Sequence, residues 1–319
     1  MIPPHALLVA GPTASGKSAL ALDLAERLDG TIINTDSMQV YTELRVLTAR
    51  PTPEEEARVP HRLYGIRPAA QPGSAAWWRA QALAAMDEAR EQHRIPILAG
   101  GTGLYFAALT QGLSDIPDAG PQARAEARAL LAELGAPALH RRLAAEDPAT
   151  AERLNPNDSQ RIARAWEVWR GTGNGLAAWQ AQFASPAPEP PWRFAAILLD
   201  PPRDELRTAI TTRFQAMLLH GAIDEVKALL AQNLDAALPA MRAHGVPELS
   251  ACLRGEISLQ AAARRTELVT GQYTKRQATW FRHHPLASRM HTIHARYADL
   301  TQFSERILAD LVSFVRSAG

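Results

Sequence analysis

The feature that most constrains this chain is a glycine-rich segment between an apolar run and a helical pattern. Residues 11–18 read Gly-Pro-Thr-Ala-Ser-Gly-Lys-Ser and fit G-x-x-x-x-G-K-[ST], the pattern of a phosphate-binding loop or P-loop. The apolar residues 6–10 before it predict a buried strand, and residues 16–29 predict a helix after it. In such a loop, backbone N–H groups converge on phosphate oxygens at a helix N-terminus. The motif therefore predicts an α/β fold and a bound polyphosphate or diphosphate.

The side chains of this loop have predictable roles. Lys17 supplies a mobile positive charge, and the hydroxyl of Ser18 is the predicted ligand of a phosphate-bound Mg²⁺, the one cofactor that we expect. A P-loop specifies a phosphate group but not a reaction. The residues predicted to bind the diphosphate are Gly11, Pro12, Thr13, Ala14, Ser15, Gly16, Lys17 and Ser18.

Short apolar runs alternate with helical patterns over the first hundred residues. Further strands are predicted at 31–36, 61–66 and 95–99, and a helix from the Ser74 cap to about residue 93. This alternation predicts parallel strands with right-handed crossovers. The fold class that we expect is a P-loop NTPase-like parallel sheet with helices on both faces.

From residue 114 the pattern changes to one helix after another. Asn157 and Asp158 are candidate caps for a helix that Gly171 is expected to end, and the proline-rich stretch 185–191 predicts a linker. A strand-like run follows at 194–200. We therefore predict that an all-helical domain, residues 114–191, is inserted into an α/β core formed by residues 1–113 and 192–319.

A long helix is predicted from the Ser258 cap to about His283. One of its faces carries a polar stripe with helical spacing, and residues 264–289 hold six basic residues against Glu267 alone. A solvated helix face and a contact to phosphates both explain this excess. The stripe consists of Gln272, Lys275, Thr279 and Arg282.

Two further polar positions follow predicted strands. Asp36 ends the 31–36 run, at the sheet edge where ligands bind in open α/β sheets. A metal organiser, a general base and a helix cap all remain open for Asp36. A second glycine-rich turn, residues 100–103, contains Thr102 and is either a tight turn or a close approach to a ligand.

Composition excludes several classes of protein. No apolar run approaches the roughly 20 residues of a membrane helix. Because Cys252 is the only cysteine, an internal disulfide and a Cys-rich zinc site are excluded. The net charge of +1 does not by itself indicate a polyanionic partner. We expect a cytoplasmic protein, with a monomer as the default.

Taken together, the motifs resemble those of the tRNA dimethylallyltransferase (tRNA isopentenyltransferase) family, bacterial type. The matching segments run in collinear order along nearly the whole chain. They are GPTASGKS (11–18), DSMQVY (36–41), TARP (48–51), PHRL (60–63), GGTGLY (100–105), NPNDSQRIARAWEV (155–168), RFQAM with Gly221 and Glu225-Val226, and YTKRQATWFR (273–282).

The resemblance implies transfer of a dimethylallyl group from dimethylallyl diphosphate to N6 of the adenosine 3′-adjacent to the anticodon, with release of diphosphate. It implies Asp36 as general base, Thr102 as a contact to the same adenosine, and Lys17 and Arg213 as catalytic cations. The implied partners are the anticodon stem-loop of tRNA and the allylic diphosphate, with no membrane and no obligate protein partner. Residues implied to contact tRNA are Asp36, Ser37, Met38, Gln39, Thr102, Arg124, Gln160, Arg161, Ile162, Ala163, Arg164, Arg242, Lys275, Arg276, Gln277 and Arg282.

The chain departs from the family pattern in the glycine-rich segment 171–175 and after Gly245. A Tyr-Arg pair commonly follows the glycine that is Gly245 here, and this chain has Val246-Pro247 instead. The main alternative function is a P-loop kinase for a nucleotide or small metabolite, in which Asp36 would activate a hydroxyl. A non-catalytic RNA-binding ATPase is less well supported, because no apolar strand ending in a metal-organising acid precedes Gly100.

Overall fold

The computed structural model describes residues 4–114, 116–182, 192–297 and 305–317, and the chain divides into two compact units. One unit comprises Met1–Thr110 and Pro190–Gly319, and the other comprises Gln111–Glu189. The predicted domain boundaries lie within three residues of these limits. The predicted linker at 185–191 lies outside the described residues.

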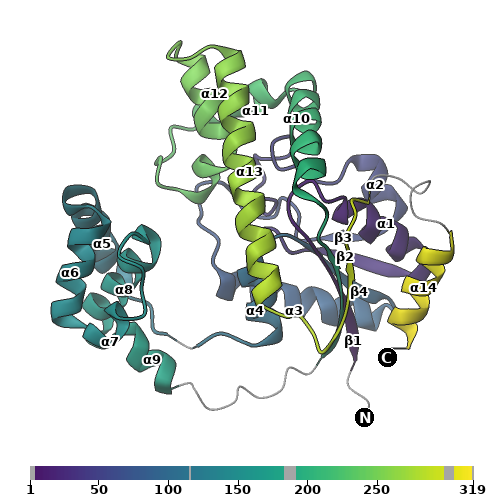
Figure 1. The fold of residues 1–319 in the computed structure, drawn as a ribbon, viewed down its shortest axis with the longest axis horizontal. Helices are drawn as coiled ribbons and strands as arrows, with labels where there is room; N and C mark the ends of the chain where they lie inside the picture. Colours follow the sequence, from purple (N-terminus) through teal and green to yellow (C-terminus); the bar gives the residue numbers. More distant parts are fainter. Residues whose placement is uncertain (1–3, 115, 183–191, 298–304, 318–319) are drawn as a thin grey trace. The chain divides into compact units, whose positions relative to one another are not determined.

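The first unit is built on a six-stranded sheet with the strand order β3-β2-β4-β1-β5-β6 (Figure 1). All of its strand pairs are parallel, and the P-loop strand β1 lies between β4 and β5. The strands are β1 (His5–Ala10), β2 (Gly30–Asn34), β3 (His61–Arg62), β4 (Ile95–Gly100), β5 (Arg193–Leu199) and β6 (Arg289–Ile293). The predicted parallel α/β fold is confirmed.

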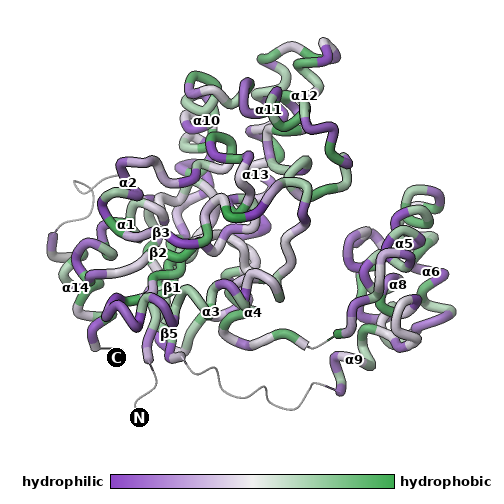
Figure 2. Tube along the Cα trace, turned by 180° about the vertical axis from the view of Figure 1, so that it is seen from behind, coloured by the Kyte–Doolittle hydropathy of each residue, from purple (hydrophilic) through white to green (hydrophobic). Residues whose placement is uncertain are grey.

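Helices cover both faces of this sheet, so its central strands are apolar on both sides. In β1, Leu7 and Val9 pack in a cluster with α1 (Lys17–Leu28) and α14 (Glu305–Arg316), whereas Leu8 packs in the cluster on the opposite face. The hydrophobic colouring of β1 in Figure 2 reflects this double burial. The remaining helices of this unit are α2 (Pro53–Arg58), α3 (Ala75–Glu91), α4 (Gly103–Thr110), α10 (Arg203–Leu219), α11 (Ala222–Leu230), η1 (Pro239–Arg242), α12 (Val246–Leu253) and α13 (Leu259–His283).

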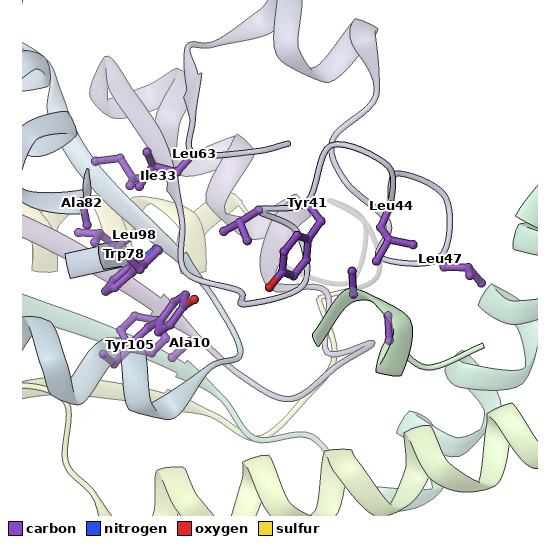
Figure 3. Close-up of a cluster of buried hydrophobic side chains, with 14 of the residues drawn as sticks. Ala10, Ile33, Tyr41, Leu44, Leu47, Leu63, Trp78, Ala82, Leu98 and Tyr105 are labelled. Carbon is purple, nitrogen blue, oxygen red and sulfur yellow. The ribbon is translucent and has the colours of Figure 1, made fainter. Parts of the chain in front are cut away.

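An aromatic pair joins the core to the carboxyl end of the sheet. Trp78 of α3 stacks on Tyr105 of α4, with ring centroids 4.3 Å apart (Figure 3). The Trp78 indole N–H donates to the carbonyl oxygen of Asn34, at 2.8 Å, where β2 ends. The packing of two helices therefore fixes the point at which the chain leaves β2.

The described residues of the second unit form helices and no strand, as predicted. Leu139, Leu143, Ile162 and Trp166 are buried in its own hydrophobic core. Its helices are α5 (Gly120–Leu134), α6 (Ala136–Glu146), α7 (Pro148–Ala151), α8 (Ser159–Thr172) and α9 (Leu176–Gln182).

Some predicted boundaries were wrong for identifiable reasons. The helix capped by Asp158 does not end at Gly171 but continues to Thr172, and Gly173 ends it with φ +75°. Gly171 instead packs so closely on Ala119 that a Cβ would collide with its carbonyl. The strand predicted at 61–66 has only two residues, because Leu63 adopts φ +66° and turns the chain away from β2.

The Val246-Pro247 departure lies at the start of α12. Gly245 is its N-cap residue, with φ +96°, a conformation that favours glycine. Val246 is buried in the core, whereas Pro247 is exposed in the first turn, where proline is tolerated. Among the described residues, no helix has both the length and the apolar character needed to cross a membrane.

Candidate active site

The P-loop connects the end of β1 to the first turn of α1. Ala14 and Gly16 both adopt positive φ, at +66° and +88°, and the Ser15 N–H donates to the Pro12 carbonyl at 3.2 Å. These conformations curl the backbone ahead of the helix, where unpaired N–H groups and the helix dipole favour an anion. Ser18 is exposed in the first turn of α1, and Lys17 is partly buried.

Charged groups from three elements interact electrostatically at this loop. Burial lowers the pKa of Lys17 to about 8, although the nearby carboxylate of Asp36 acts in the opposite direction and Arg213 acts in the same direction. Burial also lowers the pKa of Arg213 on α10, against the attraction of Asp36. Lys17 Nζ donates to the Pro12 carbonyl at 3.3 Å. The structure therefore brings together the predicted pair of cations and the predicted base.

Asp36 is held by a hydrogen-bonded turn directly after β2. The buried side chain of Asn34 accepts the Asp36 N–H at 2.9 Å and donates to the Asp36 and Leu63 carbonyls, each at 3.0 Å. Asp36 Oδ1 in turn accepts the N–H of Met38 at 2.9 Å. Since the Asp36 N–H bonds the Asn34 side chain, β2 ends at Asn34, earlier than predicted. No helix begins at Asp36, so the helix-cap interpretation was wrong.

Sequence reasoning missed Asn34. Its position, one residue before Thr35 and two before Asp36 at the end of an apolar run, was the available signal: a polar side chain buried at a strand end needs partners. Here those partners are backbone groups on both sides of Asp36.

Thr102 locks the second glycine-rich turn onto the Asp36 turn. Its hydroxyl accepts the Ser37 N–H at 3.0 Å, and its own N–H donates to the Thr35 carbonyl at 3.2 Å. A Cβ on Gly100 would collide with the Thr35 backbone, so this close approach requires glycine. The residues after β2 and β4 therefore form one unit at the carboxyl edge of the sheet.

Gln277 of α13 connects this edge to the P-loop. Its Oε1 accepts the N–H of Thr13 at 2.8 Å and the Thr13 hydroxyl at 3.1 Å, while its Nε2 donates to the Gly101 carbonyl at 2.8 Å. Gln277 is only 4% exposed. The long helix is thus attached to both glycine-rich loops through one amide.

The negative charge of Asp36 acts on three tyrosines. Burial, and then the negative charge of Asp36, raise the pKa of Tyr273 to about 12 and that of Tyr64 still further. The pKa of Tyr105 is raised by burial first, then by Tyr41 and by Asp36. All three phenols are therefore neutral near pH 7. Tyr64 and Tyr105 were also missed as site residues, although they directly follow or end the matched segments PHRL and GGTGLY.

A turn at 45–49 holds the Arg213 side chain. Glu225 Oε2 accepts the N–H groups of Arg45 and Val46 at 2.7 and 2.6 Å, and Oε1 accepts that of Leu47 at 2.9 Å. The next carbonyl, that of Thr48, accepts Gln39 Nε2 at 2.9 Å and an Arg213 guanidinium nitrogen at 3.3 Å. Glu225 therefore anchors the turn that holds Arg213.

The predicted tRNA contacts of the first unit divide by exposure. Lys275, Arg276 and Arg282 lie on the exposed side of α13, and Arg242 is exposed at the end of η1. Gln277 faces the opposite way and is occupied by the two glycine-rich loops. Roles in tRNA binding stay predictions for all of these residues.

The predicted contacts of the second unit lie on α5 and α8. Gln160 and Arg161 are exposed in the first turn of α8, whereas Ile162 and Ala163 are buried in the core of the unit. The two remaining residues form ion pairs: Arg164 with Glu167 at 3.1 Å, and Arg124 with Asp118. The side chains of this set that solvent can reach therefore come from Arg124, Gln160, Arg161 and Arg164.

Comparison with known proteins gives a consistent result. The family model described as IPP transferase matches residues 39–284. A tRNA dimethylallyltransferase from Granulibacter bethesdensis is 65% identical over 315 residues, covering 98% of both chains.

Solved structures agree with this match. A full-length tRNA isopentenylpyrophosphate transferase from Bacillus halodurans is 31% identical, with a TM-score of 0.68 over 98% of this chain and 97% of that one. A eukaryotic dimethylallyltransferase acting on tRNA, 23% identical, shares the fold, with a TM-score of 0.80 over 98% of this chain and 80% of that one. The chain therefore belongs to the tRNA dimethylallyltransferase (IPP transferase) family.

Proposed function

We propose that this chain transfers the dimethylallyl group of dimethylallyl diphosphate to N6 of the adenosine 3′-adjacent to the tRNA anticodon, releasing diphosphate. The observation that carries this proposal is the electrostatic interaction of Asp36 with the P-loop cation Lys17 and with Arg213. A phosphate loop next to a carboxylate suits a reaction in which a diphosphate leaves while the acceptor loses a proton.

The leaving group is the diphosphate. The bond between C1 of the allyl group and the diphosphate oxygen breaks, and the electron pair of that bond stays on the oxygen. The P-loop N–H groups, Lys17 and Arg213 neutralise the developing charge. Because Lys17 is partly buried, its charge is less screened by water than a surface charge would be.

The nucleophile is the exocyclic adenine amine, which is weak because its lone pair is delocalised into the ring. N6 forms the new bond to C1, and a proton passes from N6 to the carboxylate of Asp36. Since Oδ1 of Asp36 already accepts the Met38 N–H, Oδ2 is the oxygen that takes the proton. The adenosine must leave its stack to reach this edge, at a cost of a few kcal/mol, and we assign Thr102 as its contact.

The residues present suit a Mg²⁺ ion that arrives with the diphosphate. In the described part of the chain, no three His, Cys, Asp or Glu side chains gather into a metal site. Mg²⁺ in phosphate sites is commonly held by one or two protein groups, water and phosphate oxygens, and Ser18 presents an exposed hydroxyl at the start of α1. When bound, the ion would neutralise diphosphate charge.

The anticodon stem-loop would contact both units. In the first unit, Lys275, Arg276 and Arg282 present positive charge on α13. In the second unit, Arg124, Gln160, Arg161 and Arg164 are the reachable side chains. With tRNA as the substrate, we expect the activity in the cytoplasm.

One assay separates this proposal from the kinase alternative. The protein is incubated with Mg²⁺ and unmodified tRNA, once with labelled dimethylallyl diphosphate and once with ATP and candidate acceptors. Label in tRNA at the adenosine next to the anticodon supports the transferase. Transfer of a γ-phosphoryl group without prenylation of tRNA would overturn it.

The same assay tests Asp36. Asp36→Asn keeps an oxygen for the Met38 N–H but has no carboxylate to accept a proton. We expect turnover to fall by roughly 10²-fold or more while tRNA affinity stays within about twofold. Unchanged turnover would remove Asp36 from the role of general base.

A further inference from the structure

A stack of two aromatic rings lies at the end of α13. Trp280 and His284 are 4.4 Å apart between ring centroids, and their planes differ by 3°. On another side, Trp280 packs against Gly103, where a Cβ would collide with the indole ring. Gly103 begins α4, which α13 contacts near its C-terminal end (Figure 1). The stack therefore extends outward from the loop that carries Thr102.

The outer ring of this stack is both exposed and held in place. His284 is exposed, and its Nδ1 lies 2.8 Å from the Trp280 carbonyl oxygen, so Nδ1 carries the proton and donates. Among the described residues, Trp280 is the one ring stacked on His284. A flat ring face, ordered by a hydrogen bond and a stacking partner, is thus available to solvent.

The surroundings of this ring are basic. Lys275, Arg276, Thr279, Trp280, His283 and His284 line a groove of about 430 Å³. In the described part of the chain, no carboxylate pairs with Lys275 or Arg276, and Arg282 Nε lies 3.9 Å from an Asp200 carboxylate oxygen. Flat ring faces flanked by cations are typical of sites that hold unstacked RNA bases.

We propose that His284 is a stacking platform for a nucleobase of the anticodon loop, a near neighbour of the adenosine that enters the Asp36 site. The inference rests on the proposed function, because it takes tRNA as the ligand. Gln277, which touches both glycine-rich loops, lies seven residues before His284, or about 10 Å along the helix axis. At this distance a base that leaves the loop beside the extruded adenosine meets the exposed face of His284.

The test compares three variants in binding to an unmodified anticodon stem-loop RNA, measured without the allylic donor. His284→Ala removes the ring, His284→Phe keeps a flat ring, and His220→Ala is the matched control. His220 is also exposed and follows a helix, α10, with its Nδ1 2.6 Å from the carbonyl four residues before. Because stacking of one base on an aromatic side chain is worth about 1–3 kcal/mol, we expect His284→Ala to weaken binding at least about fivefold. His284→Phe and His220→Ala should stay within about twofold of the parent.

A second measurement identifies the base. Stem-loops that carry an abasic residue on either side of the target adenosine are bound to the parent and to His284→Ala. One of the two abasic positions should weaken binding to the parent about fivefold. The same position should leave binding to His284→Ala nearly unchanged, because that variant already lacks the stacking ring. Equal affinity of His284→Ala and the parent, or equal losses in His284→Ala and His284→Phe, would overturn the platform.

The test of the stacking platform and the test of the proposed function can fail independently. A parent protein that binds the stem-loop but transfers no dimethylallyl group would overturn the proposed function. If His284→Ala still bound that RNA at least fivefold more weakly and His284→Phe did not, the stacking platform would be supported all the same.

Discussion

Replacing Glu225 by Gln tests whether one carboxylate holds the turn next to the catalytic cations. In the structure its two oxygens accept three consecutive backbone N–H groups, those of Arg45, Val46 and Leu47, at 2.6 to 2.9 Å. A Gln amide has one acceptor oxygen. In its best rotamer this oxygen keeps the two bonds made by Oε2, and the amide NH₂ then faces the Leu47 N–H.

The expected loss of stability follows from this count of hydrogen bonds. One charge-assisted bond is lost, worth about 1.5–3 kcal/mol, and two others become neutral bonds, each weaker by about 1 kcal/mol. Because Glu225 is half-buried, screening by water reduces the sum of these losses. We expect the free energy of unfolding to fall by about 2–4 kcal/mol. For a unit of this size that corresponds to a melting temperature roughly 4–16 °C lower. The Michaelis constant for dimethylallyl diphosphate should rise as well, because the Thr48 carbonyl that accepts Arg213 follows this turn.

Thermal unfolding followed by circular dichroism measures the effect, with Asp224→Asn as the matched control. Asp224 lies in the same first turn of α11, so both variants remove one negative charge from the helix N-terminus. Asp224 is exposed and pairs with Lys227 at 3.0 Å, a contact worth no more than about 0.5 kcal/mol. If Glu225→Gln lowers the melting temperature no more than Asp224→Asn does, Glu225 does not anchor the turn.

Three further predictions concern the phosphate site and the basic stripe. Because the pKa of Lys17 is about 8 and the protonated form binds phosphate, affinity for dimethylallyl diphosphate should fall as pH rises above about 8. The Lys17→Arg variant should lose this pH dependence. A flat affinity profile of the parent between pH 7 and 9.5 would contradict the role of Lys17 in binding the diphosphate. Gly16→Ala should abolish measurable diphosphate binding in calorimetry, since φ is +88° and a Cβ would collide with the Tyr297 carbonyl; near-parental affinity would show that the loop can relax. Lys275→Ala and Arg282→Ala should each weaken tRNA binding and lower the log–log salt slope by about 1, and parental slopes in both variants would mean that the stripe is solvated surface.

Much of the fold could be predicted because its signals are local. The P-loop sequence, the apolar runs of β1, β4 and β5, and the Ser74 and Ser258 caps lie within a few residues of the structure that they specify. Errors arose where a tertiary contact overrode a local signal. Gly171 reads as a helix end but serves close packing on Ala119.

The candidate site likewise has features that local sequence predicts and features that depend on tertiary contacts. A phosphate loop, an acid after β2 and a hydroxyl after β4 could all be predicted to lie together, since parallel strands bring their carboxyl ends to one edge. Two other contacts depend on tertiary packing: the bond from Thr13 to Gln277, 264 residues away, and the anchoring by Glu225 of the turn that holds Arg213. A hydrogen bond between distant residues depends on the position of whole helices against the sheet. That position results from the packing of both apolar faces, so no local pattern of residues encodes it.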